Sequence, residues 1–125
     1  MTKTDLVVLA VDDDMINLKL LKSMLMKSGY VKEVVEAQNG SDAIGELKGR
    51  NDIDLILLDI IMPVMNGIEM LKVVRADEGL RQLPIIVLTT DETKKSEALE
   101  YGANGFIMKP IRNNDLLAKI KSVIV

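Results

Sequence analysis

Hydrophobic positions along the chain fall into short apolar runs that are separated by longer segments with helical spacing. The runs predict five β-strands, at Leu6–Val11, Glu33–Ala37, Ile53–Leu58, Ile85–Leu88 and Gly105–Met108. Three of these runs are almost wholly apolar instead of alternating with polar residues, which is typical of parallel strands that are covered on both faces.

The segments between the strands predict helices at Asn17–Ser28, Ser41–Lys48, Gly67–Arg75, Lys94–Tyr101 and Asp115–Ile124. One apolar face of the first helix carries Leu18, Leu21 and Leu25, and that of the last carries Leu116, Leu117, Ile120 and Ile124. Asn39-Gly40 and Asn66-Gly67 are turn signals, and Ser41 and Asn66 are candidate helix caps. The alternation predicts one α/β domain over residues 1–125, an open parallel five-stranded sheet with helices on both faces and no attached output domain.

Composition agrees with a globular domain in the cytoplasm. The 125 residues are 48% hydrophobic and 28% charged, enough for a core and a normal polar surface. The longest apolar runs are far shorter than the roughly 20 residues that cross a bilayer, and the first residues lack the cleavage site of a secretory signal. We therefore expect no membrane association.

Two missing residue types narrow the chemistry. The chain contains neither cysteine nor histidine, which excludes disulfides, histidine-based triads and typical zinc sites. Any metal must be held by oxygen ligands, which favours magnesium or calcium. The net charge of −3 argues against a nucleic-acid surface, and Lys94-Lys95, bracketed by Asp91, Glu92 and Glu97, is better explained as a solvated helix face.

Polar residues interrupt the pattern where the predicted strands end. Asp12 and Asp13 follow the first strand, Asp59 the third, Thr89 the fourth and Lys109 the fifth. Several have ordinary structural explanations taken singly: Asp14 suits a helix N-cap, Thr89 a local hydrogen bonder and Lys109 the surface. In an open α/β sheet, however, ligands bind beyond the carboxyl ends of the strands. Carboxylates gathered there need a cation, and Mg²⁺ fits because it shares its shell between carboxylates, water and phosphate oxygens.

Four motifs together resemble the receiver (CheY-like) domain of two-component response regulators. They are Val11-Asp12-Asp13-Asp14, the segment from Leu57 to Gly67 that contains Asp59 and Met62-Pro63, Leu88-Thr89-Thr90, and Met108-Lys109-Pro110. They occur in the family's order and with its spacing over essentially the whole chain. The resemblance implies the flavodoxin-like strand order 2-1-3-4-5 and a role in signal transduction, in which the domain catalyses only its own phosphorylation and dephosphorylation.

The resemblance also assigns roles to individual residues. Asp59 corresponds to the phosphoryl acceptor, and Mg²⁺ would be held by Asp12, Asp13, Asp59 and the backbone carbonyl of Ile61. Lys109 corresponds to the lysine that neutralises phosphoryl oxygens, Thr89 to the switch hydroxyl and Phe106 to the switch aromatic. The family typically holds the bond between Lys109 and Pro110 in the cis form. The implied partners are a sensor histidine kinase or a histidine phosphotransfer protein and a downstream effector, and we expect a monomer or weak dimer.

Two further expectations concern the lifetime of the phosphoryl group and the output surface. Thr90 and Ile61 crowd the approach to Asp59, so we expect a comparatively long-lived phosphoryl group unless the carboxylate of Asp91 holds a hydrolytic water. We expect the output surface to comprise Thr93–Tyr101, Phe106 and the last helix, because only Ala98 and Leu99 anchor the fourth helix.

Two other classes of protein compete with this interpretation. Asp12-Asp13-Asp14-Met15-Ile16 resembles the first motif of haloacid-dehalogenase-like phosphatases, but the only later acidic candidate for that family is Asp115, within a helix, and Asp59 is left without a role. A nucleotide-binding domain lacks support, since neither a GxGxxG nor a GxxxxGK(S/T) motif occurs. A degenerate receiver that serves only as a binding module is a third option, weakened because every residue of the family's site is present.

Overall fold

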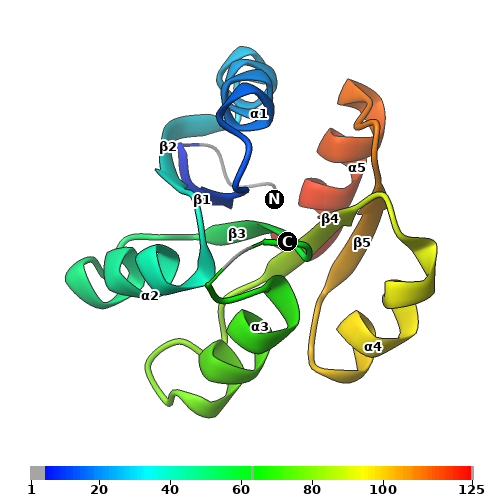
Figure 1. The fold of residues 1–125 in the computed structure, drawn as a ribbon. Coiled ribbons are helices and arrows are strands. Elements are labelled where there is room, and N and C mark those ends of the chain that lie inside the picture. Colours follow the sequence, from blue (N-terminus) through cyan, green and yellow to red (C-terminus); the bar gives the residue numbers. More distant parts are fainter. Residues whose placement is uncertain (1–4, 63, 125) are drawn as a thin grey trace.

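The computed structural model describes residues 5–62 and 64–124. Strands and helices alternate along the chain (Figure 1). The strands are β1 (Leu6–Val11), β2 (Val31–Ala37), β3 (Leu55–Asp59), β4 (Ile85–Thr89) and β5 (Gly105–Met108). The helices are α1 (Met15–Lys27), α2 (Gly40–Gly49), α3 (Gly67–Ala76), α4 (Lys95–Glu100) and α5 (Asn113–Ile124), with a 3₁₀ turn, η1 (Glu92–Lys94), before α4.

The five strands form one parallel sheet in the order β2-β1-β3-β4-β5, which confirms the expected topology. The three central strands β1, β3 and β4 are buried along their whole length. Their side chains pack on both faces of the sheet, which explains why these strands are read as continuous apolar runs. The register pairs Val11 with Leu58 and Asp59 with Leu88, so the neighbouring strands end close together.

Helices cover both faces of the sheet (Figure 1). One layer contains α1 and α5, whose buried residues, among them Leu18, Leu25 and Leu116, pack with the inward side chains of one face. The other layer contains α2, α3 and α4, represented in the second core by Leu47, Leu71 and Ala98. Within the described residues no helix is long and apolar enough to cross a membrane.

Side-chain caps fix where the first three helices begin. The Asp14 carboxylate accepts a hydrogen bond from the Ile16 N–H, so α1 starts before the predicted Asn17. Asn66 caps α3 in a capping box, as expected. The predicted cap at Ser41 is wrong: Asn39 caps α2 by accepting from the Asp42 N–H, so the helix already begins at Gly40.

The fourth helix differs most from the prediction. Its first residues form η1, and α4 itself contains six residues. Ala98 is its buried residue, whereas the second predicted anchor, Leu99, is 43% exposed. The helix is therefore held to the domain by even less apolar contact than its sequence indicated.

Candidate functional site

The candidate site lies at the edge of the sheet where the parallel strands end. Asp12 directly follows β1, Asp59 and Thr89 are the last residues of β3 and β4, and Lys109 directly follows β5. Asp12, Asp59 and Thr89 are the buried polar residues of the described chain, each 7% exposed or less. Burial of polar side chains in one place is costly unless they interact with one another or with a ligand.

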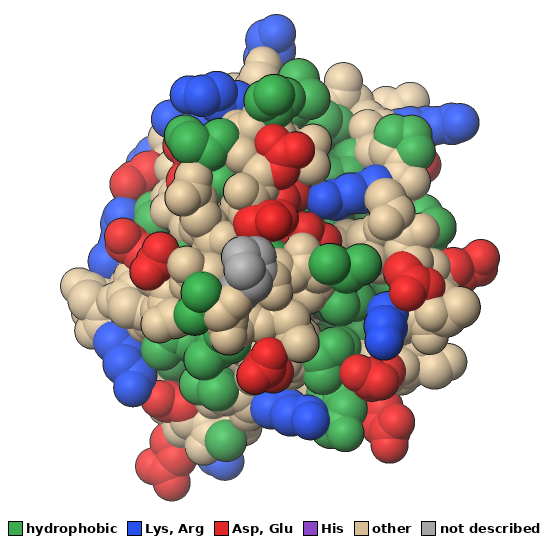
Figure 2. All heavy atoms as spheres, in the orientation of Figure 1, with side chains coloured by type: hydrophobic (Ala, Val, Ile, Leu, Met, Phe, Trp, Pro, Cys, Tyr) green, Lys and Arg blue, Asp and Glu red, His purple; other side chains and the backbone are tan. Residues whose placement is uncertain are grey.

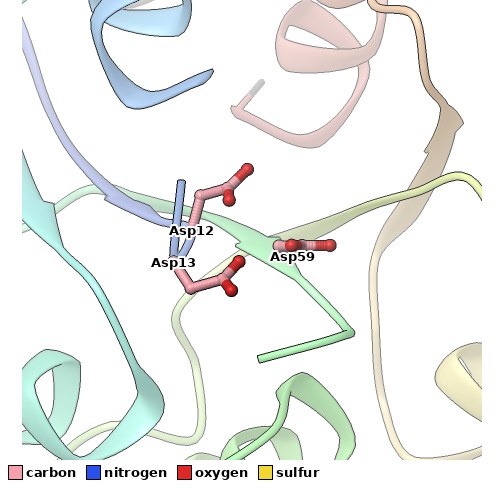
Figure 3. A group of neighbouring side chains, drawn as sticks. All are labelled: Asp12, Asp13 and Asp59. Atoms are coloured by element: carbon pink, nitrogen blue, oxygen red, sulfur yellow. The ribbon is translucent and has the colours of Figure 1, made fainter. Parts of the chain in front are cut away.

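Three carboxylates converge at this edge. Asp12, Asp13 and Asp59 each offer one oxygen, and these oxygens lie within 4.8 Å of one another (Figure 3). The convergence follows from the strand order, which makes β1 and β3 neighbours in the middle of the sheet. An all-oxygen group of this kind is what a hard divalent cation such as Mg²⁺ requires.

Lys109 supplies the positive charge next to the three carboxylates. Its Nζ lies 2.9 Å from Oδ2 of Asp12 and 3.7 Å from Oδ2 of Asp59, although 97 residues separate it from Asp12. The peptide bond between Lys109 and Pro110 is cis, as the resemblance implied. Figure 2 shows acidic side chains gathered near the middle of this face with a basic side chain beside them.

The environment of Asp59 favours its protonated form in the metal-free protein. Burial raises the pKa of its carboxyl group from 3.8 to about 6, although the ammonium of Lys109 acts in the opposite direction. Repulsion by Asp12 and Asp13 contributes to this rise in pKa, and a hydrogen bond with the Ile61 backbone opposes it. A buried carboxylate surrounded by like charges is a strained anion that a cation would stabilise.

Thr89 and Phe106 lie on the side of the site that faces α4. The hydroxyl of Thr89, which is fully buried, accepts a hydrogen bond from the Asp91 N–H at 3.1 Å, so it is directed toward the loop after β4. Phe106 is half-buried on β5, and the ammonium of Lys95 lies 5.9 Å from the centre of its ring. The site is thus connected through this loop to the start of α4.

Close backbone packing holds the loop between β3 and α3 against Asp59. The N–H of Gly67 donates to the carbonyl of Ile60 at 2.8 Å, and a Cβ at Gly67 would lie 2.5 Å from the Asp59 carbonyl oxygen. Glycine is therefore required where α3 begins. Within the loop Ile61 is 58% exposed, Val64 is 81% exposed with a φ of +69°, and Pro63 of the sequence motif lies outside the described residues.

Comparison with known proteins identifies the family of the chain. Residues 8–121 match the family model of the response regulator receiver domain. Over 118 residues the chain is 36% identical to the chemotaxis protein CheY1 of Helicobacter pylori, covering 93% of this chain and 94% of that protein. The chain belongs to the response regulator receiver family.

Solved structures agree with this assignment. A putative response regulator from Chloroflexus aurantiacus superposes with a TM-score of 0.89 at 30% identity, covering 97% of this chain and 98% of that one. The receiver domain of a sensor histidine kinase from Pseudomonas aeruginosa, with a magnesium ion coordinated in its active site cleft, superposes with a TM-score of 0.86 at 28% identity over 97% and 98% of the two chains. This chain is accordingly a receiver domain of two-component signalling, and receiver domains are signalling domains rather than classical enzymes.

The position of Asp115 argues against the phosphatase alternative. Asp115 lies in the first turn of α5 and lines a groove with Phe106 and Lys119 between β5 and α5. It is not a member of the carboxylate group of Asp12, Asp13 and Asp59. The structure therefore gives Asp59, which that alternative left without a role, the central position.

Sequence reasoning missed several contacts of the receiver domain. The Asp91 carboxylate, a candidate holder of hydrolytic water, also caps η1, accepting from both the N–H and the hydroxyl of Thr93, and these hydrogen bonds lower its pKa. The steric role of Gly67 was not recognised beyond its turn signal. No sequence pattern indicated that Arg75 would hold together three segments next to α4.

Proposed function

We propose that this receiver domain takes up a phosphoryl group on Asp59 in a Mg²⁺-dependent reaction and that this changes its surface at α4, β5 and α5. The observation that carries the proposal is the position of Asp59, whose carboxylate lies opposite two other acidic side chains and 3.7 Å from the ammonium of Lys109. We assign the donor role to a phosphohistidine of a sensor kinase or a histidine phosphotransfer protein, which has to be a separate protein segment because this chain has no histidine.

The charges of the site suit a divalent cation. Three carboxylates and one ammonium leave a local net charge of about −2 when all are ionised, which one Mg²⁺ balances. Asp12, Asp13 and Asp59 would hold the ion together with the backbone carbonyl of Ile61. When bound, the ion neutralises phosphoryl oxygens, which allows an anion to approach another anion.

The chain's own residues account for the rest of the transfer. An oxygen of Asp59 attacks the phosphorus, a P–O bond forms, and the P–N bond to the donor imidazole breaks in line with it. The donor ring carries a proton on its other nitrogen, so the electron pair of the broken bond stays on the imidazole nitrogen and the donor leaves as neutral histidine. Lys109, already 3.7 Å from Asp59, neutralises a phosphoryl oxygen as the negative charge of the site increases.

Thr89 and Phe106 convert the new charge into a change of shape. The Thr89 hydroxyl exchanges its hydrogen bond with the Asp91 N–H for one to a phosphoryl oxygen. This movement vacates space beside β5 into which Phe106 turns. A shift from 1:99 to 99:1 takes about 5.5 kcal/mol, whereas one charge-assisted hydrogen bond supplies roughly 1.5–3 kcal/mol, so Lys109 and the ion contribute as well.

An apolar surface beside the site suits a protein donor. On α1, Met15, Ile16 and Leu20 are each at least half exposed, an unusual grouping for a helix that faces only water. They adjoin a groove of about 570 Å³ that Leu20 lines together with Asp12 and Lys109. A donor helix packed on this apolar face would carry its phosphohistidine to the edge of the site, so we assign α1 to donor docking.

Phosphorylation can be followed by intact-protein mass spectrometry with the small phosphodonor acetyl phosphate. We expect the parent protein to gain one phosphoryl group with Mg²⁺ and none with a chelator. Asp59→Asn should gain none, whereas the control Asp115→Asn, which changes an exposed carboxylate of α5, should behave like the parent. Labelling of Asp59→Asn to the parental level, or labelling undiminished by the chelator, would exclude the proposal.

The output surface can be mapped by amide hydrogen exchange with and without beryllofluoride, a mimic of the phosphoryl group. We expect changes in Thr93–Tyr101, around Phe106 and in α5. Changes confined to α1 and α2 would contradict this assignment.

A further inference from the structure

The two ends of α4 are held very differently, beginning with the C-terminal end. The N–H groups of Gly102 and Ala103 donate to the carbonyls of Leu99 and Ala98 at 3.1 and 3.0 Å, and Gly102 has a φ of +103°. This is a Schellman motif, which satisfies the terminal carbonyls of a helix and stops it firmly. In addition, the ammonium of Lys72 on α3 lies 4.4 Å from the centre of the Tyr101 ring.

Arg75 of α3 clamps the same end of α4. Its Nε and Nη2 both donate to the carbonyl of Gly102, at 3.0 and 2.8 Å, and Nη2 also donates to Oδ1 of Asn104. Its Nη1 donates to the carbonyls of Arg81 and Leu83, which precede β4. A Cβ at Gly102 would lie 2.9 Å from Arg75 Nε, so the glycine permits both the turn and the approach of the guanidinium.

The N-terminal end of α4 has less support, because its side-chain cap is that of Asp91 on η1, which accepts from the N–H and the hydroxyl of Thr93. Lys94, the residue at the N-cap position, makes no capping hydrogen bond through its side chain, and η1 before it has no buried residue. Lys95 and Ser96 are exposed, and the contact of Lys95 with Phe106 is at 5.9 Å near the limit for a cation–π interaction. The loop that leads to this end begins at Asp91, whose N–H is bonded to the Thr89 hydroxyl.

We infer that α4 swings about a fixed pivot at Gly102 and Ala103, with Arg75 as the positioning residue that holds the pivot. The movement enters at the opposite end, because the release of the Asp91 N–H by Thr89 loosens the loop that leads into η1. The helix then acts as a lever, with a large displacement of residues 91–96 and a small one of residues 101–103. This inference rests on the proposed function of Asp59 and adds the direction of the movement.

The role of Arg75 at the pivot is tested first without any ligand, by amide hydrogen exchange measured for each residue with NMR. In the parent we expect the amides of Gly102 and Ala103 to exchange more slowly than those of residues 94–96. Arg75→Lys keeps the positive charge but loses the several hydrogen bonds of the planar guanidinium. It should accelerate amide exchange at Gly102 and Ala103 about tenfold or more, while the exchange rates of residues 94–96 stay within twofold of those in the parent. Arg112→Lys, a change at an exposed arginine, is the control and should match the parent.

The direction of movement is tested by the chemical-shift changes that Mg²⁺ and beryllofluoride produce in the full chain. In the parent they should be large at residues 91–96 and small at 101–103, and in Arg75→Lys they should extend through Ala103. If Arg75→Lys does not fold, Asn104→Ala, which removes one acceptor of the guanidinium, should accelerate exchange at Gly102 and Ala103 in the same direction by a smaller factor.

Each contrary result identifies what has failed. Unchanged exchange at Gly102 and Ala103 in Arg75→Lys, or in Asn104→Ala where that variant stands in for it, overturns the role of Arg75. Equal shifts at both ends of α4 in the parent, with clear shifts around Asp59, overturn the pivot and leave the proposed function intact. Absence of any shift around Asp59 overturns the proposed function and the inference with it.

Discussion

Replacement of Asp59 by asparagine should stabilise the metal-free receiver domain at neutral pH, although it removes the residue on which the proposed function depends. Asn is close to Asp in shape and stays neutral, so the variant avoids the cost of a buried carboxylate close to Asp12 and Asp13. Such a gain in stability on loss of a functional group is expected where a site holds strained charges.

The size of the effect follows from the pKa of Asp59. Burial raises it from 3.8 to about 6, so between these two pH values the folded protein binds a proton that the unfolded chain has released. The free energy of unfolding of the parent therefore falls as pH rises through this window, and the loss is complete above about pH 6. At about 1.4 kcal/mol per pH unit the loss reaches roughly 2–3 kcal/mol.

Urea unfolding and thermal unfolding, each followed by circular dichroism with a chelator present, measure the difference between parent and variant. At pH 7 Asp59→Asn should be more stable by about 2–3 kcal/mol, with a Tm roughly 6–12 °C higher, and near pH 3.5 the two proteins should be nearly equal. Groups such as Glu33 and Asp91, whose pKa values are lowered, titrate in both proteins and cancel in the difference. A variant no more stable than the parent at pH 7, or a gain that does not depend on pH, would refute the reasoning.

Three further predictions concern the loop that follows Asp59. Val64→Gly should raise the free energy of unfolding by about 0.5–1 kcal/mol in urea titrations, because glycine relieves the positive φ and the exposed valine side chain contributes little packing; lower stability would contradict this. Gly67→Ala should cost about 1–3 kcal/mol in the same assay, since its Cβ would meet the Asp59 carbonyl, and an unchanged midpoint would disprove that contact. Ile61→Asn should lose the phosphoryl group faster than the parent, by up to roughly 10²-fold if the amide orients water. Equal rates of phosphoryl loss in mass spectra recorded over time would show that Ile61 does not shield Asp59 from water.

The fold was accessible from the sequence because burial on both faces leaves a clear pattern. The central strands β1, β3 and β4 contain almost only apolar residues, and few other structures produce such runs between helical segments. The strand order came from the family resemblance. Spacing alone does not distinguish one order of parallel strands from another.

Details such as the residue that caps a helix were harder to predict from the sequence. Asn39 and Ser41 are both good cap residues, and the pattern did not favour either. Gly40 decides between them, because its N–H donates to the carbonyl of Met65 at 3.1 Å and this contact fixes the start of α2. Leu99 was misjudged for a related reason: in a helix of six residues, one apolar side chain can lie on the outer face without loss of the fold.

The site residues could be listed from their positions at the strand ends, but their contacts could not. The pairing of Lys109 with Asp12 joins the residues that directly follow β1 and β5, two strands that are not neighbours in the sheet. The clamp formed by Arg75 depends on backbone carbonyls, which every residue has and no sequence motif marks. Contacts of this kind require the three-dimensional arrangement.

The contact between Lys72 and Tyr101 has a practical consequence for spectroscopy. The chain has two tyrosines and no tryptophan, and the second tyrosine, Tyr30, lies under the ammonium of Lys121 at 4.9 Å. Neither tyrosine thus reports directly on the moving end of α4, because Tyr101 lies at the pivot and Tyr30 lies between α1 and β2, against a lysine of α5. An unchanged tyrosine signal during activation would therefore not mean that the domain is inactive, and an optical reporter of the moving end has to be introduced, for example by Ser96→Trp.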